Sequence, residues 1–188
     1  MFAILVIGTA FGNFLFKKTD NIKMVSEPIL ENVLPVDTTN NKIMRPYINP
    51  NVKILKKYYN YSDSLENQLD SIIYYNNVYM QNTGVIYGSE EEFDVIAIAD
   101  GQVIEVSEDQ TFGKTIKIKH QNDAISIYHF LSNVLVSNNK EVKKGDIIGK
   151  SGTSNLLPEP SFQLYIEFAL KGEFLNIEDF YDKDISEI

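Results

Sequence analysis

Short runs of apolar residues, several of them alternating with polar ones, occupy most of this chain after residue 51. The alternation is clearest in Lys114-Thr115-Ile116-Lys117-Ile118-Lys119, where the charged and aliphatic side chains would point to opposite faces of a sheet. Other runs are rich in Val, Ile, Tyr and Phe and predict strands over residues 52–59, 71–75, 78–80, 95–99, 102–107, 124–130, 133–136 and 163–170. Asp100-Gly101 predicts a hairpin turn between two of these strands, and Lys171-Gly172 predicts another.

Helical patterns are scarce in the same part of the chain. Residues 61–70 are polar and predict either a loop or a single helical turn, and residues 176–181 predict a short closing helix. Residues 142–149 predict a turn that leads into a strand. The pattern as a whole predicts an all-β domain of short antiparallel strands.

The first part of the chain has a different character. Residues 1–17 are mostly apolar and predict a membrane helix, although the uncharged run is just short of the roughly 20 residues that span a bilayer. A signal peptide is the alternative, but there is no basic segment before the apolar run and no small-x-small cleavage site. A late gene start would explain the short run. Lys17 and Lys18, directly after it, favour a cytoplasmic position for that end.

Three regions follow from this division: a membrane helix over residues 1–17, a polar linker with scattered prolines over residues 18–44, and the β domain over residues 45–188. The linker would carry the β domain away from the membrane.

Composition narrows the chemistry of the domain. The net charge of −9 argues against a nucleic-acid partner, which requires a face of Lys and Arg. The chain has no cysteine, which removes disulfides, thiolate metal sites and cysteine nucleophiles. It has two histidines, His120 and His129, whereas a catalytic zinc takes three protein ligands with histidine usually among them.

The segment Asn82-Thr83-Gly84-Val85-Ile86, with the β pattern that follows it, resembles the LytM-type zinc peptidases that cut peptidoglycan cross-bridges. In that family the segment is His-x-Gly-x-Asp, and the His and the Asp bind zinc. The resemblance implies a LytM-like barrel-sandwich fold, also called a duplicated hybrid motif. It also implies that Asn82 and Ile86 replace both ligands, while Gly84 is kept.

The second motif of that family is His-x-His on a strand that ends in Glu. Gln163-Leu164-Tyr165-Ile166-Glu167 matches this strand, so the resemblance implies that Gln163 replaces the general base and Tyr165 replaces a ligand. A further family histidine corresponds to Phe130. No metal or other cofactor is therefore expected, and no catalytic residue.

His129 and His120 are the remaining candidates for a metal site. His129 is adjacent to Phe130 in sequence, and one residue along a strand changes the face, so we expect His129 at the surface or at an edge. We expect His120, at the end of a strand, to make a structural hydrogen bond.

Several blocks narrow the resemblance to a degenerate branch of the family, the stage II sporulation protein Q family. These blocks are Ser71-Ile72-Ile73-Tyr74-Tyr75, residues 78–84, 93–103, 145–155 and 176–183. The resemblance implies a single-pass forespore membrane protein whose domain lies between forespore and mother cell. There it would bind a stage III sporulation protein AH-type partner and support engulfment and a channel-like complex, with peptidoglycan and other sporulation proteins as further partners.

Two alternatives remain open at this point. One is a peptidoglycan-directed zinc endopeptidase with non-standard ligands, and the other is a wall-binding activator of a separate hydrolase. The sequence does not identify the face that would bind a partner, although a domain built of strands offers free edges to one.

Overall fold

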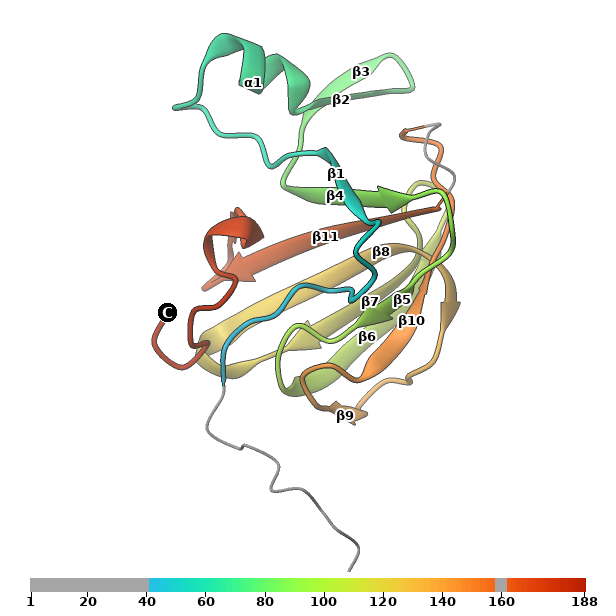
Figure 1. Cartoon of the computed structure of the whole chain (residues 1–188), viewed down its shortest axis with the longest axis vertical. Helices are drawn as coiled ribbons and strands as arrows, with labels where there is room; N and C mark the ends of the chain where they lie inside the picture. Colours follow the sequence, from blue (N-terminus) through green and yellow to red (C-terminus); the bar gives the residue numbers. More distant parts are fainter. Residues whose placement is uncertain (1–40, 158–161) are drawn as a thin grey trace, which may run out of the picture. The chain divides into compact units, whose positions relative to one another are not determined.

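The structure is a computed structural model that describes residues 41–157 and 162–188. In these residues, three short helical elements and a hairpin accompany a large sheet (Figure 1). The first elements in chain order are β1 (Lys53–Lys56), α1 (Leu65–Asp70), β2 (Ile72–Tyr75), β3 (Val78–Gln81), β4 (Gly84–Ser89), β5 (Asp94–Ile96), β6 (Gly101–Asp109) and β7 (Gly113–Lys119). The remaining elements are η1 (Gln121–Asp123), β8 (Ala124–Val134), β9 (Glu141–Val142), β10 (Ile147–Ser151), β11 (Phe162–Leu170), β12 (Glu173–Leu175) and η2 (Ile177–Asp179).

Within these two described ranges, ten strands form one antiparallel sheet. Its main order is β1-β4-β11-β8-β7-β6-β9, with β10 and β5 attached beside β8 and β12 beside β11. The all-β fold that the sequence predicts is confirmed, and α1 shows that residues 65–70 take the helical one of the two alternatives left open for residues 61–70. β2 and β3 form a separate hairpin, whose turn residues Asn76 and Asn77 have φ values of 49° and 62°. Positive φ at both turn residues suits the right-handed twist of the strands.

Strand β8 changes partner halfway along its length. Its first half pairs with β11 as far as His129 opposite Tyr165, and its last residues pair with β10 from Leu131 onward. Phe130, between the two stretches, has a φ of 65°. A non-glycine residue in this region is uncommon, and here it marks the point where the strand bends from one neighbour to the next.

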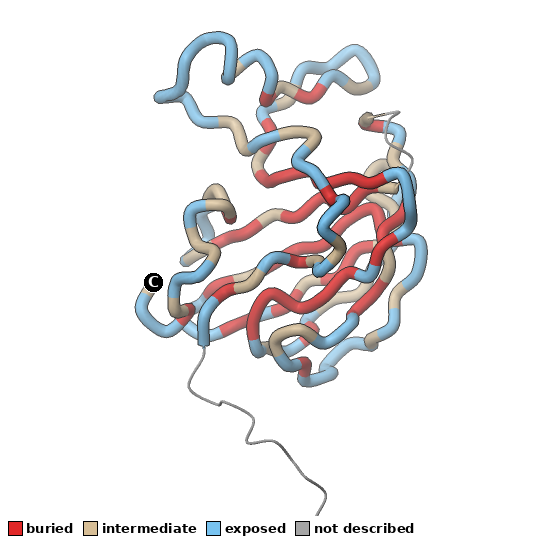
Figure 2. Tube along the Cα trace, viewed as in Figure 1, coloured by how far each residue is buried: buried red, intermediate tan, exposed pale blue. Residues whose placement is uncertain are grey.

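Apolar side chains pack into two clusters on the described residues. The larger one is the main core and includes Tyr87, Tyr128, Leu164, Ile166 and Phe168. The smaller cluster consists of Ile73, Ile86, Phe130, Leu156 and Tyr165, with further partly buried side chains around it. Because successive strand residues point to opposite faces, β4 and β11 contribute alternate residues to the two clusters. Figure 2 shows both strands as largely buried.

The predicted hairpin at Asp100-Gly101 is wrong. β5 pairs with β10 and not with β6, because residues 97–99 leave the strand path as a buried, irregular segment. Ala97 donates its N–H to the carbonyl of Asp146 over 2.9 Å and accepts one from Gly145 over 2.9 Å, so it is held by the loop before β10. The turn dipeptide is present, but the hydrogen bonds of Ala97 with the loop before β10 keep the strands on either side of the dipeptide from pairing.

Packing begins earlier in the chain than the expected boundary at residue 45. Ile43 is 1% exposed, donates its N–H to the Lys183 carbonyl over 2.9 Å and accepts the N–H of Asp182 over 2.9 Å. The last residues of the expected linker are therefore part of the folded domain.

The expected membrane helix over residues 1–17 lies outside the described residues, as does most of the expected linker. In the described part of the chain, no helix has the length and apolar character needed to cross a membrane.

Candidate functional site

Three of the five residues predicted at the family's reactive positions meet in the smaller apolar cluster. Ile86 on β4 and Tyr165 on β11 are direct cross-strand partners, so their side chains share one face of the sheet. The ring of Phe130, from β8, lies stacked against that of Tyr165 at a centroid distance of 5.7 Å. Ile86 is 0% exposed. These side chains give the place an apolar floor.

The β2–β3 hairpin and a loop after β10 close this cluster from above. Ile73 is buried in it, and Tyr75 and Met80 pack against it from the same face of the hairpin. Leu156 completes the cover. The chain thus fills this place with its own side chains.

Gln163 and Asn82 are the polar members of the predicted set, and both bind backbone groups. The Gln163 amide donates to the carbonyl of Leu157, which ties β11 to the loop before it. The Asn82 amide donates to the carbonyl of Lys57 over 2.7 Å, and the Asn82 carbonyl accepts the N–H of Tyr59 over 2.8 Å. Both side chains are buried, and each amide nitrogen donates to a backbone carbonyl.

Gly84 is retained for a reason of space. It lies opposite Glu167 across the β4–β11 pair, and a Cβ atom added to it would stand 2.1 Å from the carbonyl oxygen of Ile166. No side chain fits there, so the close approach of the two strands requires glycine at this position.

His129 corrects one of our predictions. It was expected at the surface or at an edge, yet it is 7% exposed and its ring lies stacked on that of Tyr165 at 5.2 Å. His129 is the cross-strand partner of Tyr165, so it shares the face of the candidate site. Phe130 reaches the same side because its positive φ interrupts the alternation of the strand.

A buried polar network lies beside the apolar cluster and centres on Glu167. One carboxylate oxygen lies 3.1 Å from Nε2 of His129, whose Nδ1 lies 2.9 Å from the hydroxyl of Thr115. The other oxygen accepts hydrogen bonds from Thr83 at 2.5 Å and from the Tyr165 hydroxyl at 3.0 Å. The network joins β7, β8 and β11 to Thr83, the residue directly before β4.

The surroundings of Glu167 shift its pKa in opposite directions. Burial acts to raise the pKa, but hydrogen bonds to His129, Thr83 and Tyr165 outweigh it and hold the pKa below its ordinary value. Burial, with the negative charge of Glu167 nearby, raises the pKa of Tyr165. The carboxylate is therefore ionised and the phenol neutral at neutral pH, which suits their hydrogen bond.

The residues at this site do not fit a zinc ion. An aliphatic side chain, two aromatic rings and two amides bound to backbone supply no set of imidazole and carboxylate ligands. Among the residues that the structure describes, no three His, Asp or Glu side chains are grouped so that they could hold a metal.

His120 lies away from the site and has the structural hydrogen bonds that the sequence predicts. Its Nδ1 lies 2.8 Å from the carbonyl of Asp100 and its Nε2 lies 2.7 Å from the hydroxyl of Ser126. Burial lowers its pKa. The neutral ring thus braces the irregular segment before β6.

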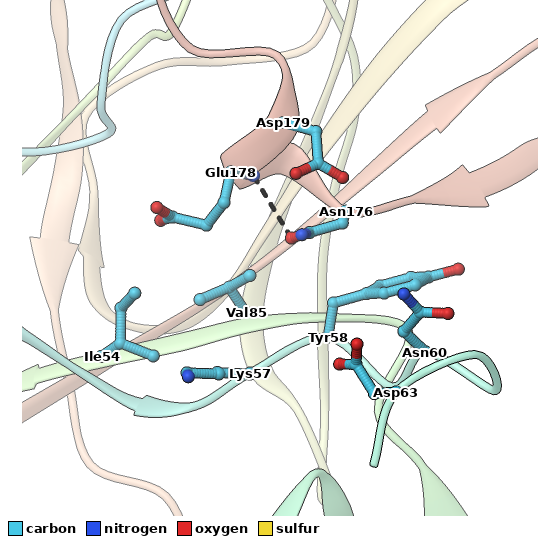
Figure 3. Close-up of a pocket in the computed structure, with 9 residues that line it drawn as sticks. All are labelled: Ile54, Lys57, Tyr58, Asn60, Asp63, Val85, Asn176, Glu178 and Asp179. Carbon is cyan, nitrogen blue, oxygen red and sulfur yellow. Dashed lines mark hydrogen bonds between the residues drawn. The ribbon is translucent and has the colours of Figure 1, made fainter. Parts of the chain in front are cut away.

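A cavity of about 380 Å³ lies on the opposite face of β4, lined by Val85 (Figure 3). Ile54 and Lys57 form one wall, and Glu178 and Asp179 of η2 form another. Arg45 donates hydrogen bonds from its two terminal nitrogens, Nη1 and Nη2, to the Glu178 carboxylate at 2.9 and 3.2 Å, which fixes that carboxylate at the rim. This cavity is separate from the apolar cluster.

Sequence reasoning missed the roles of Glu167 and of the hairpin. Glu167 lies two residues from Tyr165 on a mostly apolar strand, so the alternation alone places it on the same face. The hairpin signal at Asn76-Asn77 was available too, but the sequence does not say what a hairpin covers.

The chain matches one protein-family model and several curated proteins. The model of Peptidase family M23 matches residues 80–177. The chain is 26% identical to stage II sporulation protein Q of Bacillus subtilis (strain 168) over 179 residues, which cover 94% of this chain and 60% of that protein. It is 33% identical to the murein hydrolase activator EnvC of Escherichia coli (strain K12) over 93 residues, which cover 50% of this chain and 22% of that protein. The chain thus spans less than two thirds of the length of either relative.

Solved structures agree with these matches. A structure of the SpoIIQ–SpoIIIAH pore forming complex contains a chain that superposes with a TM-score of 0.75 at 26% identity, covering 79% of this chain and 96% of that chain. A zinc containing peptidase from Vibrio cholerae shares the fold, with a TM-score of 0.57 at 18% identity over 71% of this chain and 38% of that one. With the family model matching more than half of its residues, the chain belongs to peptidase family M23.

Proposed function

We propose that this chain is a membrane-anchored, catalytically inactive LytM-like scaffold of endospore formation. It binds a stage III sporulation protein AH-type partner across the space between forespore and mother cell, and supports engulfment and a channel complex. The observation that carries the proposal is the similarity to a chain in the solved structure of the SpoIIQ–SpoIIIAH complex. The superposition covers 96% of that chain.

The candidate site supports inactivity. Ile86, Phe130 and Tyr165 fill one apolar cluster under the β2–β3 hairpin, and the polar candidates bind backbone groups. A domain that keeps the fold and Gly84, while its reactive positions hold apolar side chains or amides bound to backbone, is expected to act through its surface.

The anchoring is proposed from the sequence and from the similarity to the sporulation relative. A membrane helix over residues 1–17 would hold the chain in the forespore membrane, and residues 18–44 would form most of the connection to the domain of residues 45–188. Lys17 and Lys18, which follow the apolar run, do not favour the orientation this requires. Labelling of a cysteine introduced directly after the run, in intact forespores, would decide the orientation.

Calorimetric titration tests the proposal directly. The full-length chain in mild detergent is titrated with the extracytoplasmic domain of the AH-type protein of the same organism. Saturable binding with a Kd of about 1 μM or tighter, about −8 kcal/mol, is the expected result. Absence of binding would overturn the proposal.

A second candidate is an activator of a separate wall hydrolase. It is favoured by the 33% identity to murein hydrolase activator EnvC over half of this chain. Co-sedimentation with purified sacculi, together with stimulation of the organism's amidases, would support this function. If the chain neither co-sediments nor stimulates, this candidate is ruled out.

An active zinc endopeptidase is the third candidate, and the side chains at the site speak against it. Elemental analysis of the purified full-length chain, with an assay on cross-linked muropeptides, distinguishes an active endopeptidase from an inactive scaffold. Stoichiometric zinc together with cleavage would refute the inactive scaffold.

A further inference from the structure

Three charged side chains in the cavity beside Val85 have no partner among the described residues. Lys57, Asp63 and Asp179 line this cavity of about 380 Å³, and their charged groups make no hydrogen bond or ion pair within the described chain. Solvated charges are common on a protein surface, but these three converge on one hollow. Its volume lies in the range of small-molecule sites, about 300–1,000 Å³.

The fourth charged residue of the lining, Glu178, is already bound by other parts of the chain. Arg45 donates two hydrogen bonds to its carboxylate, at 2.9 and 3.2 Å, and the Tyr87 hydroxyl donates another. The free charges of the cavity are therefore one ammonium group and two carboxylates.

The charges of opposite sign lie on different walls. Figure 3 shows Lys57 on one side of Val85 and Asp63 on the other, with Asp179 on a third side. A ligand that bound all three would have to carry its own charged groups at separate points.

Hydrogen bonds to the backbone hold these walls in position. The hydroxyl of Tyr58 donates to the carbonyl of Phe174 over 3.0 Å, which ties the segment after β1 to β12. Asn176 accepts the N–H of Glu178 over 3.3 Å and so begins the turn that carries Asp179. The fold itself thus forms the cavity before any ligand enters.

The complement of these free charges is a ligand with one carboxylate and two ammonium groups. A free basic amino acid such as lysine has these three groups, and its aliphatic chain suits the apolar surface of Val85 and Ile54. A diamine would leave Lys57 unpaired, and a neutral amino acid would leave one carboxylate unpaired.

The cavity is separate from the positions that correspond to the family's reactive centre. The family model matches residues 80–177, whereas Lys57, Asp63 and Asp179 all lie outside that range. Val85 faces the cavity and its neighbour Ile86 faces the apolar cluster, because successive strand residues point to opposite faces.

We propose that this cavity is a binding site for a free basic amino acid. Lys57 binds the carboxylate of the ligand, and Asp63 and Asp179 bind its two ammonium groups. The site goes beyond the scaffold function and does not depend on it.

Calorimetric titration of the full-length chain in mild detergent with three related probes tests the assignment. L-lysine has all three charged groups, L-norleucine lacks the second ammonium group, and cadaverine lacks the carboxylate. Because the walls are solvated, we expect a Kd of about 1 mM for L-lysine. The other two probes should bind at least about 10-fold more weakly, because each leaves a charge of the cavity unpaired.

Variants of the lining assign each charge to its part of the ligand. Lys57→Gln should weaken L-lysine binding at least about 10-fold and should not weaken cadaverine binding, because cadaverine has no carboxylate. Asp179→Asn should weaken both. Lys53→Gln removes an exposed lysine of β1 outside the cavity and is the matched control, for which both affinities should stay unchanged.

Thermal unfolding of these variants should match that of the wild type, because the replaced groups have no partners in the described chain. Absence of L-lysine binding up to about 20 mM would refute the site. So would binding that Lys57→Gln and Asp179→Asn leave unchanged, or L-norleucine binding equal to that of L-lysine. None of these results bears on the titration with the AH-type protein, so the scaffold function is judged separately.

Discussion

The imidazole of His129 lies 3.1 Å from the carboxylate of Glu167, across the pair of strands β8 and β11. Both side chains are almost completely buried, and Tyr165 stacks on the imidazole while it donates to the carboxylate. The contact lies next to the residues predicted at the family's ligand positions. A polar link between side chains thus joins these strands where zinc would not fit.

Replacement of Glu167 by Gln should lower the stability of the domain. The amide cannot accept all the hydrogen bonds that His129, Thr83 and Tyr165 now direct at the carboxylate. We expect a loss of about 1–3 kcal/mol in the free energy of unfolding, measured by urea denaturation. Glu105→Gln, which breaks an exposed contact with Lys117 on the same sheet, is the control and should change little. Equal effects for the two variants would contradict a stabilising role of the network.

The same carboxylate should make stability depend on acid pH. Its pKa is lower in the folded chain than the ordinary glutamate value of about 4.3, because the hydrogen bonds outweigh burial. The stabilisation is therefore complete above that ordinary value and is lost as the pH falls through the lower folded value. Urea midpoints measured from about pH 6 down to about pH 3 should fall more steeply for the wild type than for Glu167→Gln. Parallel curves would contradict this.

A zinc site should be recoverable if the predicted ligand positions are correct. The triple variant Asn82→His, Ile86→Asp and Tyr165→His supplies the family's ligand types and should bind one zinc ion, measured by elemental analysis after dialysis. Ile86→Asp alone should lower the unfolding free energy by several kcal/mol, because it buries an unpaired charge at a position that is 0% exposed.

The single variant serves as the control for the triple variant. Zinc should raise the melting temperature of the triple variant and leave that of Ile86→Asp unchanged. A folded triple variant that binds no zinc would mean that the three positions do not converge as the family's ligands do.

The backbone of Phe130 gives a fourth prediction. Removal of its buried ring should cost about 3–5 kcal/mol in either Phe130→Ala or Phe130→Gly. Glycine weakens an ordinary strand more than alanine, but the φ of 65° reverses this preference, so Phe130→Gly should be more stable than Phe130→Ala by about 1 kcal/mol.

The same pair of substitutions at Tyr128, a buried residue of the same strand without positive φ, is the control. There alanine should be the better of the two. The same order at both positions would contradict a special backbone conformation at Phe130.

The alternation of side chains along strands predicted much of the fold and part of the site. It placed Gln163 and Tyr165 on one face, because this follows from a period of two residues. It failed for His129, because nothing in the sequence announces that Phe130 adopts a left-handed conformation. It also failed at Asp100-Gly101, where bonds between Ala97 and the distant residues Gly145 and Asp146 decide which strands pair.

The attachment of Ile43 to the end of the chain has a mechanical consequence. A pulling force applied to the chain before residue 41 would act first on the contacts of Lys42 and Ile43. Lys42 forms an antiparallel bridge with Asp184, and Ile43 makes backbone hydrogen bonds with Asp182 and Lys183. A pull along the axis of this segment loads these bonds together in shear, because bonds of an antiparallel pair run across the strand direction. The last residues of the domain thus hold residues 42 and 43 in place, and a chain trimmed before Lys183 would yield to such a force first at these residues.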